Sequence, residues 1–347
     1  MIYLIDLESV ETRYTKQWKT HLPKLLSKAG LNVEVIDGPR AGIPEATTPG
    51  AFLNFGGTNI YKAAQITKIS KLFCEGKIKD GDYFLYTDAW NPTVIQLKYM
   101  AELLGVKIRI GGMWHAGSYD PQDFLGRLIG NKPWVRHAER SMFACYNDNF
   151  FATQFHIDMF EKTFLISNKS IKRVGWPMEY LKDTLAGYEE EKENIVLFPH
   201  RIAPEKQHDI FLDLADSFPD YQFVTAQEKQ LTKDEYHKLL AKSKMVFSAN
   251  LQETLGISWY EGALVGAVPF VPNRLSYSEM ATKEVLYPSV WTKDFDSYLK
   301  HKDKLVERMK SVLESNNHPE ICSSVVNTLT DFFNGDALYT RIKEHST

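Results

Sequence analysis

The sequence contains only three cysteines in 347 residues, and they are far apart. Cys74, Cys145 and Cys322 form no Cys-x-x-Cys pair, so we predict neither a zinc site nor a disulfide framework, and a reducing compartment is favoured. Long apolar runs are absent too, because no stretch approaches the roughly eighteen uninterrupted apolar residues that indicate a membrane-spanning helix. We therefore expect a cytoplasmic protein that does not span a membrane.

A basic amphipathic helix, which would dock on a membrane surface, is also missing, and nothing indicates an obligate protein partner. What is present is the composition of a soluble globular protein, 44% hydrophobic and 24% charged. The net charge of −3 is uneven: residues 1–176 hold 22 Lys and Arg against 17 Asp and Glu, and the remainder holds 19 against 27. A basic half would attract an anionic acceptor, although ordinary scatter explains a charge of this size equally well.

Short apolar runs alternate with segments of helical period in both halves of the chain. This pattern predicts βαβ units and an α/β fold with a parallel sheet in each half. Val174-Gly175-Trp176-Pro177 interrupts it, so we predict a first domain at residues 1–176, a second at 177–330 and a C-terminal helix within 331–347. The predicted strands are Ile2–Ile5, Leu31–Ile36, Tyr83–Thr87 and Val106–Ile110, then Ile195–Phe198, Gln222–Val224, Met245–Phe247 and Val268–Val271.

The chain from Met245 to Gly262 has the pattern of a buried strand, a polar loop and a helix. The first amides of a helix lack intrahelical partners and carry the positive end of its dipole. Gly256 has no side chain to hold a ligand away. We therefore predict that the amides of Gly256 and Ile257 bind a phosphate group.

Glu253 and Glu261 belong to the same stretch, one in the loop and the other about two turns along the helix. A carboxylate that accepts both hydroxyls is a usual way to hold a ribose. One glutamate is thus predicted to face a sugar and the other a ribose. A lone pair of glutamates on a helix is more often a solvated face, so this pair needs supporting motifs.

Two further motifs accompany the Glu-x7-Glu spacing of Glu253 and Glu261. They are the run Gly262-Ala263-Leu264-Val265-Gly266-Ala267-Val268-Pro269 and the segment His200-Arg201-Ile202-Ala203-Pro204-Glu205-Lys206. The three motifs together resemble the donor-binding domain of retaining glycosyltransferases with the GT-B fold, of the family-4-like type. That family usually has a glycine before the arginine and after the lysine of its phosphate-binding loop, where this sequence has His200 and Gln207.

The resemblance implies two Rossmann-like domains facing a central cleft, with the last helix returning to the first domain. A UDP-sugar is the expected donor, and no metal is required, since cationic side chains and the helix dipole take its place. Arg201 and Lys206 would contact the diphosphate and act in catalysis with Glu253. The expected donor-binding residues are Arg201, Lys206, Glu253, Thr254, Leu255, Gly256, Ile257 and Glu261.

Two predicted strands of the first domain end in polar residues, which places these residues at the carboxyl edge of a parallel sheet, where ligands bind. Asp88 and Trp90 follow one strand, and Trp114 and His115 follow the next. His115 stands where the resembling family has a histidine beneath the transferred sugar, and Asp88 is positioned for the acceptor hydroxyl, so both are predicted to be catalytic. The alternatives are a structural histidine at a glycine-rich turn, a helix N-cap at Asp88 and core packing for both tryptophans.

The loop after the first predicted strand, from Asp6 to Tyr14, lacks the glycine pair that many relatives of the fold carry there. Arg13 and Tyr14 are candidates in this loop for binding phosphate or acceptor. A stretch rich in Pro, Gly and Thr from Gly38 to Gly57 is a candidate acceptor lip.

The opening block from Asp6 to Trp18 is similar to phage-encoded glycosyltransferases that modify 5-hydroxymethylcytosine in DNA. This similarity implies transfer of a hexose or pentose, such as glucose or arabinose, to duplex DNA. A glycan, a small molecule or a modified tRNA base is an alternative acceptor, and an inactive nucleotide-sugar-binding protein is the alternative outside the enzyme class. The expected acceptor-binding residues are Arg13, Tyr14, Trp90 and Trp114.

Overall fold

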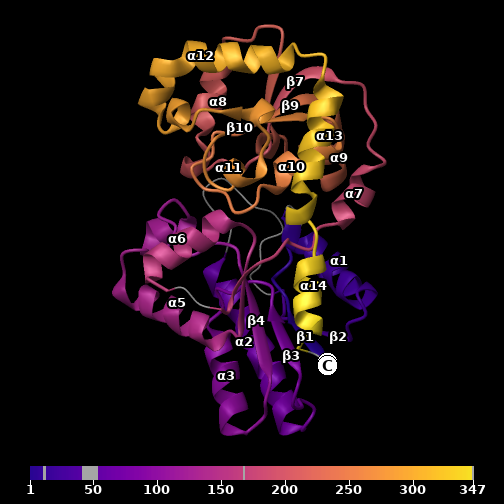
Figure 1. Cartoon of the computed structure of the whole chain (residues 1–347), viewed down its shortest axis with the longest axis vertical. Helices are drawn as coiled ribbons and strands as arrows, with labels where there is room; N and C mark the ends of the chain where they lie inside the picture. Colours follow the sequence, from indigo (N-terminus) through magenta and orange to yellow (C-terminus); the bar gives the residue numbers. More distant parts are fainter. Residues whose placement is uncertain (11–12, 41–53, 167–168, 346–347) are drawn as a thin grey trace. The chain divides into compact units, whose positions relative to one another are not determined.

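The computed structural model describes residues 1–10, 13–40, 54–166 and 169–345, which form two compact units. Unit 1 contains the described residues up to Met178 together with residues 334–345, and unit 2 contains residues 179–333. Each unit has one parallel sheet with helices on both faces (Figure 1). The predicted α/β class with two parallel sheets is therefore confirmed.

The sheet of unit 1 has six parallel strands in the order β2-β1-β3-β4-β5-β6. Residues of β1 pair in register with both neighbours, so that Ile2 lies beside Val33 and Tyr83. Every side chain of β1 and β3 is at most 3% exposed, as expected for parallel strands covered on both faces. The strands are β1 (Ile2–Ile5), β2 (Val33–Ile36), β3 (Tyr83–Tyr86), β4 (Arg109–Trp114), β5 (Asp148–Phe151) and β6 (Ile171–Arg173).

Strand β4 differs from its prediction, because it runs from Arg109 to Trp114 instead of ending at Ile110. Gly111 and Gly112 therefore lie inside the strand and not in a turn. Large aromatic rings cross the sheet above them: a Cβ at Gly112 would lie 2.6 Å from the ring of Tyr146. The glycines make room for these rings, a requirement that the local sequence pattern does not reveal.

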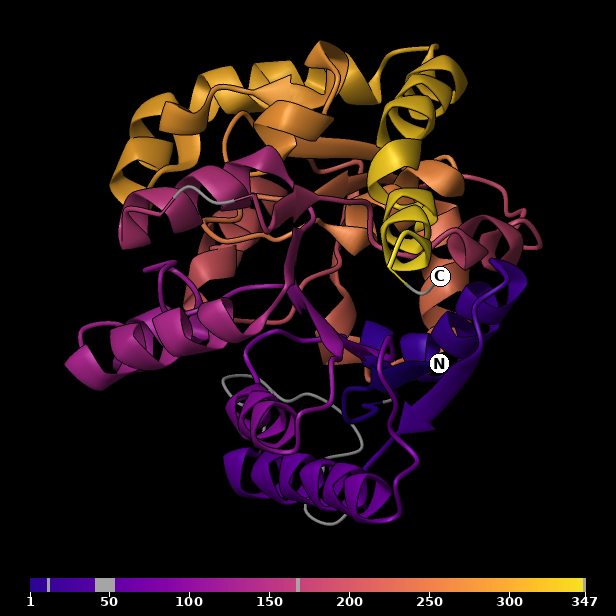
Figure 2. The same cartoon turned by 60° about the horizontal axis from the view of Figure 1, so that its bottom comes forward.

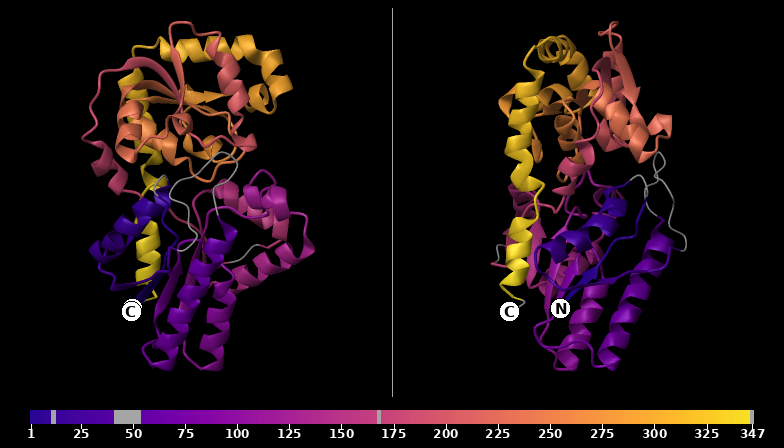
Figure 3. Two further views of the ribbon diagram at one scale, coloured as in Figure 1. Left: turned by 180° about the vertical axis from the view of Figure 1, so that it is seen from behind. Right: turned by 90° about the vertical axis from the view of Figure 1, so that its right-hand side faces the viewer.

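The helices of unit 1 divide between the two faces of its sheet. The chain leaves β1 in one direction to reach β2 and then crosses β1 to continue in the other direction, so right-handed crossovers place α1 on one face and α2, α3 and α5 on the other. The last helix, α14, lies on the opposite side of the sheet from α2 and α3 (Figures 2 and 3). These helices are α1 (Tyr14–Lys28), α2 (Phe55–Cys74), α3 (Thr93–Leu103), α4 (Phe124–Ile129), α5 (Pro133–Cys145), α6 (Gln154–Phe164) and α14 (Asp336–Lys343).

Helix α14 is held to unit 1 by an ion pair between Arg341 and Asp148, with a nitrogen-to-oxygen distance of 2.9 Å. Asp148 is fully buried and also accepts a hydrogen bond of 3.0 Å from the hydroxyl of Tyr83. The end of the described chain is thus fixed to strand β5 of the first sheet.

The sheet of unit 2 has five parallel strands in the order β11-β10-β9-β7-β8. The chain moves outward from β7 to β8, and then in the opposite direction from β9 to β10 and β11. The loops after β7 and β9 therefore leave the sheet at its topological switch point, the place where open α/β sheets bind ligands. The strands are β7 (Glu193–Phe198), β8 (Gln222–Thr225), β9 (Ser243–Phe247), β10 (Val268–Pro272) and β11 (Leu286–Tyr287).

The helices of unit 2 follow the same rule, with α8 and α12 in contact on one face and α10 in contact with α7, α9 and α13 on the other (Figure 1). Helix α7 begins shortly after the predicted break at Val174–Pro177, and its residues Leu181 and Leu185 are buried. The α-helices are α7 (Tyr180–Leu185), α8 (His208–Ala215), α9 (Lys233–Lys242), α10 (Ile257–Leu264), α11 (Tyr277–Met280), α12 (Phe295–Leu313) and α13 (His318–Leu329). The 3₁₀ turns are η1 (Pro204–Lys206), η2 (Ala226–Lys229), η3 (Lys283–Val285), η4 (Ser289–Thr292) and η5 (Thr330–Phe332).

Candidate functional site

The loops after β7 and β9 contact each other directly. The amide of Leu251 donates to the carbonyl of Glu205 over 2.8 Å. The ammonium of Lys206 donates to the carbonyl of Gln252 over 2.6 Å and lies 3.4 Å from a carboxylate oxygen of Glu253. The predicted phosphate-binding loop and the predicted sugar-binding loop are thus brought together at the switch point.

Two side chains fix the backbone of these loops by binding carbonyl oxygens. Gln207 donates to the carbonyls of Ala249 and Thr292, each over 2.6 Å. Arg274 donates to the carbonyls of Ala249, Asn250 and Ser289 over 2.7 to 3.0 Å. The loop that leads to the first turn of α10 is therefore rigid before any ligand binds.

Gln207 also explains one departure of the sequence from the resembling family. Its φ of 49° and ψ of 52° lie in the left-handed region, where glycine is usual and another residue costs roughly 1–2 kcal/mol. The side-chain bonds to two carbonyls offset that cost. A left-handed position that glycine would fill at lower cost is thus held here by the side-chain bonds of Gln207.

Gly256 is the N-cap of α10, with φ 79° and ψ 61°. A Cβ at this position would lie 2.6 Å from the ring of Trp259, so both the backbone conformation and the space require glycine. Trp259 in turn donates to the carbonyl of Leu255, which is 2% exposed. Helix α10 begins at Ile257, and the amides of its first turn have no intrahelical partners. Because residue 256 is a glycine, no side chain at that position covers them.

Glu253 is held as an anion by its neighbours. Its carboxylate accepts from the side-chain amide of Asn250 over 2.9 Å and from the backbone of Thr254 over 3.2 Å. Burial by itself would raise the pKa of Glu253, but the ammonium of Lys206 outweighs it and holds the pKa below its ordinary value. The negative charge is therefore present at neutral pH.

Glu261 is more deeply buried, at 2% exposed, and three residues of α9 surround its carboxylate. Lys233 lies 3.0 Å away, His237 lies 3.6 Å away, and the hydroxyl of Tyr236 donates over 3.3 Å. Burial would raise the pKa of Glu261, but Lys233 and His237 lower it to about 2. These three residues were not predicted, although their spacing on one face of α9 was visible in the sequence.

Arg201 lies in the loop before η1 and forms an ion pair with Glu205. The side chain of Arg201 is 26% exposed, whereas that of Glu205 is fully buried. Arg201 is thus partly exposed at this edge of the sheet, whereas Lys206 is buried.

In unit 1, Tyr14 and His115 are brought together at the carboxyl edge of the sheet. The hydroxyl of Tyr14 and Nδ1 of His115 are 2.9 Å apart, and Nε2 of His115 is 2.5 Å from the carbonyl of Thr87. A carbonyl only accepts, so Nε2 carries the proton and Nδ1 accepts from Tyr14. Burial lowers the pKa of His115, with Asp88 opposing, which favours this neutral form.

Aromatic rings enclose His115. Tyr14 stacks on it with ring centroids 5.6 Å apart, and Trp18 and Trp176 lie 5.5 and 5.2 Å away. Burial raises the pKa of Tyr14 well above its ordinary value, Arg13 opposes the shift, and Asp88 adds to it, so Tyr14 stays a hydrogen-bond donor. Arg13, Tyr14, Asp88 and His115, all predicted separately, therefore share one neighbourhood.

Asp88 does not cap a helix. Its carboxylate accepts from the amide of Trp90 over 3.0 Å in a tight turn, whereas the N-cap of α3 is Pro92. Asn91, just before the cap, accepts from the amide of Thr93 over 3.1 Å. Trp90 is partly exposed, and its ring nitrogen donates to the buried Glu139 over 2.9 Å.

Trp114, predicted to bind the acceptor, is instead a core residue. It is 1% exposed, its ring nitrogen donates to Asn149 over 2.8 Å, and it stacks on Phe151 with an interplanar angle of 10°. The prediction was wrong because β4 continues through Trp114, so its side chain packs in the core beside the sheet. The predicted acceptor lip falls mostly on residues 41–53, outside the described residues.

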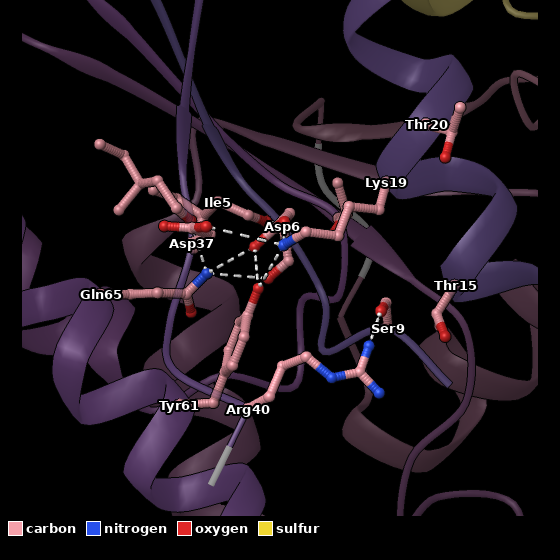
Figure 4. Close-up of polar contacts among 12 residues, drawn as sticks. Ile5, Asp6, Ser9, Thr15, Lys19, Thr20, Asp37, Arg40, Tyr61 and Gln65 are labelled. Carbon is pink, nitrogen blue, oxygen red and sulfur yellow. Dashed lines mark hydrogen bonds and ion pairs between the residues drawn. The ribbon is translucent and has the colours of Figure 1, made fainter. Parts of the chain in front are cut away.

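A buried polar network lies at the end of β1 beside this site, and sequence reasoning missed it. Asp6 accepts from Tyr61 over 2.6 Å, from Gln65 over 3.2 Å and from Lys19 over 2.9 Å (Figure 4). Burial raises the pKa of Asp6, while Tyr61 and Lys19 oppose the shift. The network ties β1 to α1 and α2, which fixes the start of the loop that leads to Tyr14.

Among the residues that the structure describes, no group of three or more His, Cys, Asp or Glu side chains is arranged to hold a metal ion. Asp294 and Asp296 lie at a helix start, because Asp294 caps α12 by accepting from the amide of Ser297 over 2.7 Å. None of the described helices is long and apolar enough to span a membrane.

No protein-family model matches the sequence, and no curated protein matches it significantly. Solved structures do match. An α,α-trehalose-phosphate synthase (UDP-forming) from Burkholderia vietnamiensis has a TM-score of 0.64 at 10% identity, over 100% of this chain and 99% of that chain. A sucrose-phosphate synthase from Thermosynechococcus elongatus has a TM-score of 0.63 at 12% identity, over 99% and 97%. A GtfA/B complex is longer: the match has a TM-score of 0.55 at 12% identity and covers 81% of this chain but only 61% of that chain.

These likenesses extend through both units, and the matched proteins are glycosyltransferases of the GT-B type. At 10–12% identity they establish the fold and not the activity. The predicted GT-B fold, with two Rossmann-like parallel sheets, is therefore confirmed.

Proposed function

We propose that this protein is a glycosyltransferase that moves a sugar from a nucleotide diphosphate, with a UDP-sugar as the expected donor, to a hydroxyl group. The observation that carries the proposal is the contact between the Lys206 loop and the Glu253 loop, beside the glycine-capped start of α10. A cation, a helix N-terminus and a carboxylate meet there at the switch point of a parallel sheet. This is an arrangement for a diphosphate with a sugar attached.

The chemistry follows from the charges at this edge. As the bond between the anomeric carbon and the phosphate oxygen breaks, negative charge grows on the diphosphate, and Arg201, Lys206 and the amides of α10 stabilise it. The acceptor oxygen forms the new bond to the anomeric carbon, and its proton passes to the departing phosphate. Glu261, kept ionised by Lys233 and His237, would accept the ribose hydroxyls.

Unit 1 supplies the acceptor side of the proposal. Tyr14, His115 and Asp88 combine a fixed hydrogen-bonding pair with a carboxylate at the carboxyl edge of the first sheet. Trp90 offers a partly exposed ring for stacking, and Arg13 offers a positive charge. These groups suit a hydroxyl on a planar or ring-shaped acceptor.

For the acceptor itself, 5-hydroxymethylcytosine in duplex DNA stays the first candidate, and it is supported only by the similarity of the opening block and by the basic character of residues 1–176. A glycan, a small molecule or a modified tRNA base is the second candidate. The UDP-forming trehalose-phosphate synthase among the matched structures favours a UDP-sugar donor and a sugar-like acceptor.

The test is mass spectrometry of hydroxymethylcytosine-containing duplex DNA and of an oligosaccharide panel, each incubated with the protein and UDP-sugars in EDTA and in magnesium. We expect a mass gain of one hexose or pentose with one donor, equal in both conditions. A gain on the oligosaccharide alone would remove the DNA acceptor. Binding of a UDP-sugar without transfer to any acceptor would leave the non-enzymatic alternative.

Salt dependence separates the two acceptors independently. Duplex DNA releases counterions on binding, with a log–log slope of roughly −0.9 per phosphate neutralised, so its KM should rise steeply between about 50 and 200 mM salt. A neutral glycan acceptor should show a flat curve over the same range.

A further inference from the structure

His200, which stands where the resembling family usually has a glycine, lies in the loop after β7. Only Pro199 separates it from the end of that strand, and it is 8% exposed. Its ring packs edge-on against Phe198, with centroids 5.1 Å apart and an interplanar angle of 85°. The ring also hydrogen-bonds to the backbone of Phe247 at the end of β9, so it bridges the two strands whose loops form the site.

One ring nitrogen of His200 makes no hydrogen bond to the described part of the chain. Nε2 is buried and has no hydrogen-bond partner in the described part of the chain. The bond to the Phe247 backbone therefore uses Nδ1, and because a carbonyl only accepts, Nδ1 carries the proton. Nε2 is thus an unprotonated acceptor, and a buried polar atom without a partner costs free energy that a ligand group can recover.

The charged groups around His200 come from both loops of the site. Lys206 and Arg201 from the β7 side are positive, and Glu253 from the β9 side is negative. Burial and, after it, Lys206 lower the pKa of His200 to about 3, with Glu253 opposing. The histidine is therefore neutral in the free protein, next to a lysine whose ammonium is already bound to Gln252 and Glu253.

We propose that His200 is a third binding group for the donor diphosphate, whose Nε2 takes up a proton from solvent and donates a hydrogen bond to a phosphate oxygen when the nucleotide binds beside Lys206 and Gly256. This inference rests on the proposed function and adds a residue that the family motif does not contain. No bond of the donor is broken in this step; only a proton moves from the solvent to the ring.

The electrostatic reason is that a diphosphate reverses the field at the ring. Its negative charge draws the ammonium of Lys206 away from Glu253 and cancels the repulsion that opposes a second proton on His200. The pKa of His200 is then higher in the complex than in the free protein, so the complex binds more protons. Nucleotide affinity must rise as pH falls through the pKa of His200 in the complex.

Isothermal titration calorimetry with UDP, repeated with ADP, measures this proton directly when each titration is run at pH 6, 7 and 8 in two buffers of different ionisation enthalpy. Two variants separate the roles of the two ring nitrogens. His200→Asn places an amide near the position of Nδ1, so it can keep the bond to Phe247 but has nothing at Nε2. His200→Gln places an amide near Nε2, which gives a donor that does not titrate.

We expect the wild-type protein to take up more protons per UDP than either variant, by up to about one proton at pH 6. His200→Asn should bind UDP about tenfold more weakly than the wild type at pH 6, the usual loss for a hydrogen bond to a charged group, and the gap should close toward pH 8. His200→Gln should bind with little dependence on pH beyond that of UDP. The phosphate of UDP titrates near pH 6 itself, but it does so equally in all three proteins.

Equal proton uptake and equal affinity in all three proteins would overturn this inference and leave His200 a structural residue, while the proposed function would stand. Failure of the wild-type protein to bind UDP or ADP would overturn the proposed function as well. Thermal unfolding of both variants checks that the fold is intact, since a misfolded His200→Asn would lose affinity equally at every pH. If His200→Asn is misfolded, the comparison of His200→Gln with the wild type still tests the proposal. Equal proton uptake in these two proteins would overturn it.

Discussion

The carboxyl edges of the two sheets are built from different chemistry. In unit 2 the charged residues of the candidate donor site are matched with opposite charges on neighbouring segments. In unit 1 the residues of the candidate acceptor site are joined by neutral hydrogen bonds and ring contacts. The unit 2 pairs are Arg201 with Glu205, Lys206 with Glu253 and Lys233 with Glu261, and the unit 1 group is Tyr14, Thr87, His115, Trp18 and Trp176.

This difference determines which interactions each edge can offer to a ligand. A cation that already lies beside a carboxylate can turn to a phosphate without leaving either charge in an apolar environment. A neutral tyrosine and histidine pair offers shape and single hydrogen bonds, each worth about 1 kcal/mol. Substitutions should therefore have large effects on donor binding in unit 2 and small effects on acceptor binding in unit 1.

The largest effect is expected from the cations of the donor edge. Arg201→Ala and Lys206→Ala should each slow transfer by a factor of about 100 or more, because each removes a contact that strengthens as charge grows on the diphosphate. Steady-state kinetics and UDP titration measure both effects. Lys238→Ala, which removes an exposed lysine of the same unit, is the matched control and should change neither.

Both variants should also lower the free energy of unfolding. Lys206 is 6% exposed and shields the charge of Glu253, so Lys206→Ala leaves that carboxylate without its nearest cation. Arg201 is paired with the fully buried Glu205, so Arg201→Ala leaves a buried carboxylate without its partner. Wild-type transfer rates in both variants would place the donor site elsewhere.

The next effect concerns the start of α10. Gly256→Ala forces a side chain into the ring of Trp259 and into a left-handed backbone, so it should weaken UDP binding at least tenfold by displacing the first amides of the helix. Gly266→Ala is the matched control: its φ of 77° is similar, but its nearest neighbour is the flexible Lys192 at 3.4 Å. This control should lose roughly 1–2 kcal/mol of stability and keep its UDP affinity. Equal UDP affinity in both variants would contradict a role for the α10 amides.

A smaller effect is expected from the buried carboxylate of Glu261. Its pKa is about 2 in the folded protein against an ordinary value of 4.5, so its ion pairs stabilise the fold above about pH 4.5 and lose that contribution as pH falls toward 2. The shift corresponds to about 3 kcal/mol as an order of magnitude. Urea unfolding of the wild type and Glu261→Gln should show a gap at pH 7 that narrows by pH 3. A gap that does not depend on pH would mean that the charge of Glu261 is not what stabilises it.

The local structure of the candidate donor site could be predicted from the sequence because its residues are close together in the chain. The strand, loop and helix from Met245 to Gly262 follow one another, and their local pattern is enough to place Gly256 and Glu253 at the end of a strand. The residues that hold this edge together come from elsewhere: Arg274 and the α9 partners of Glu261 are about 25 residues away. Contacts of that kind depend on packing, which periodicity does not specify.

The acceptor edge was harder to predict for the same physical reason. Tyr14 and His115 were each chosen from a local loop, but the bond between them joins positions 101 residues apart. The prediction for Trp114 was wrong because Gly111 and Gly112 resemble a turn in the sequence. In the structure these glycines are part of a strand and make room for the rings of Tyr83 and Tyr146. Sequence therefore located the edge and not the arrangement of side chains on it.

The smallest effect is expected at the neutral pair of unit 1. Tyr14→Phe keeps the ring that stacks on His115 but removes the hydroxyl that Nδ1 accepts from, which leaves a buried acceptor without its partner. We expect a loss of about 1 kcal/mol in unfolding free energy and a rise of a few-fold in the acceptor KM, with UDP affinity unchanged. Tyr188→Phe is the matched control, since its hydroxyl donates to Asp234 at an exposed position of unit 2, and it should change neither quantity. A rise in the UDP dissociation constant for Tyr14→Phe, with the acceptor KM unchanged, would assign this pair to donor binding. It would contradict the proposal that this edge of unit 1 binds the acceptor.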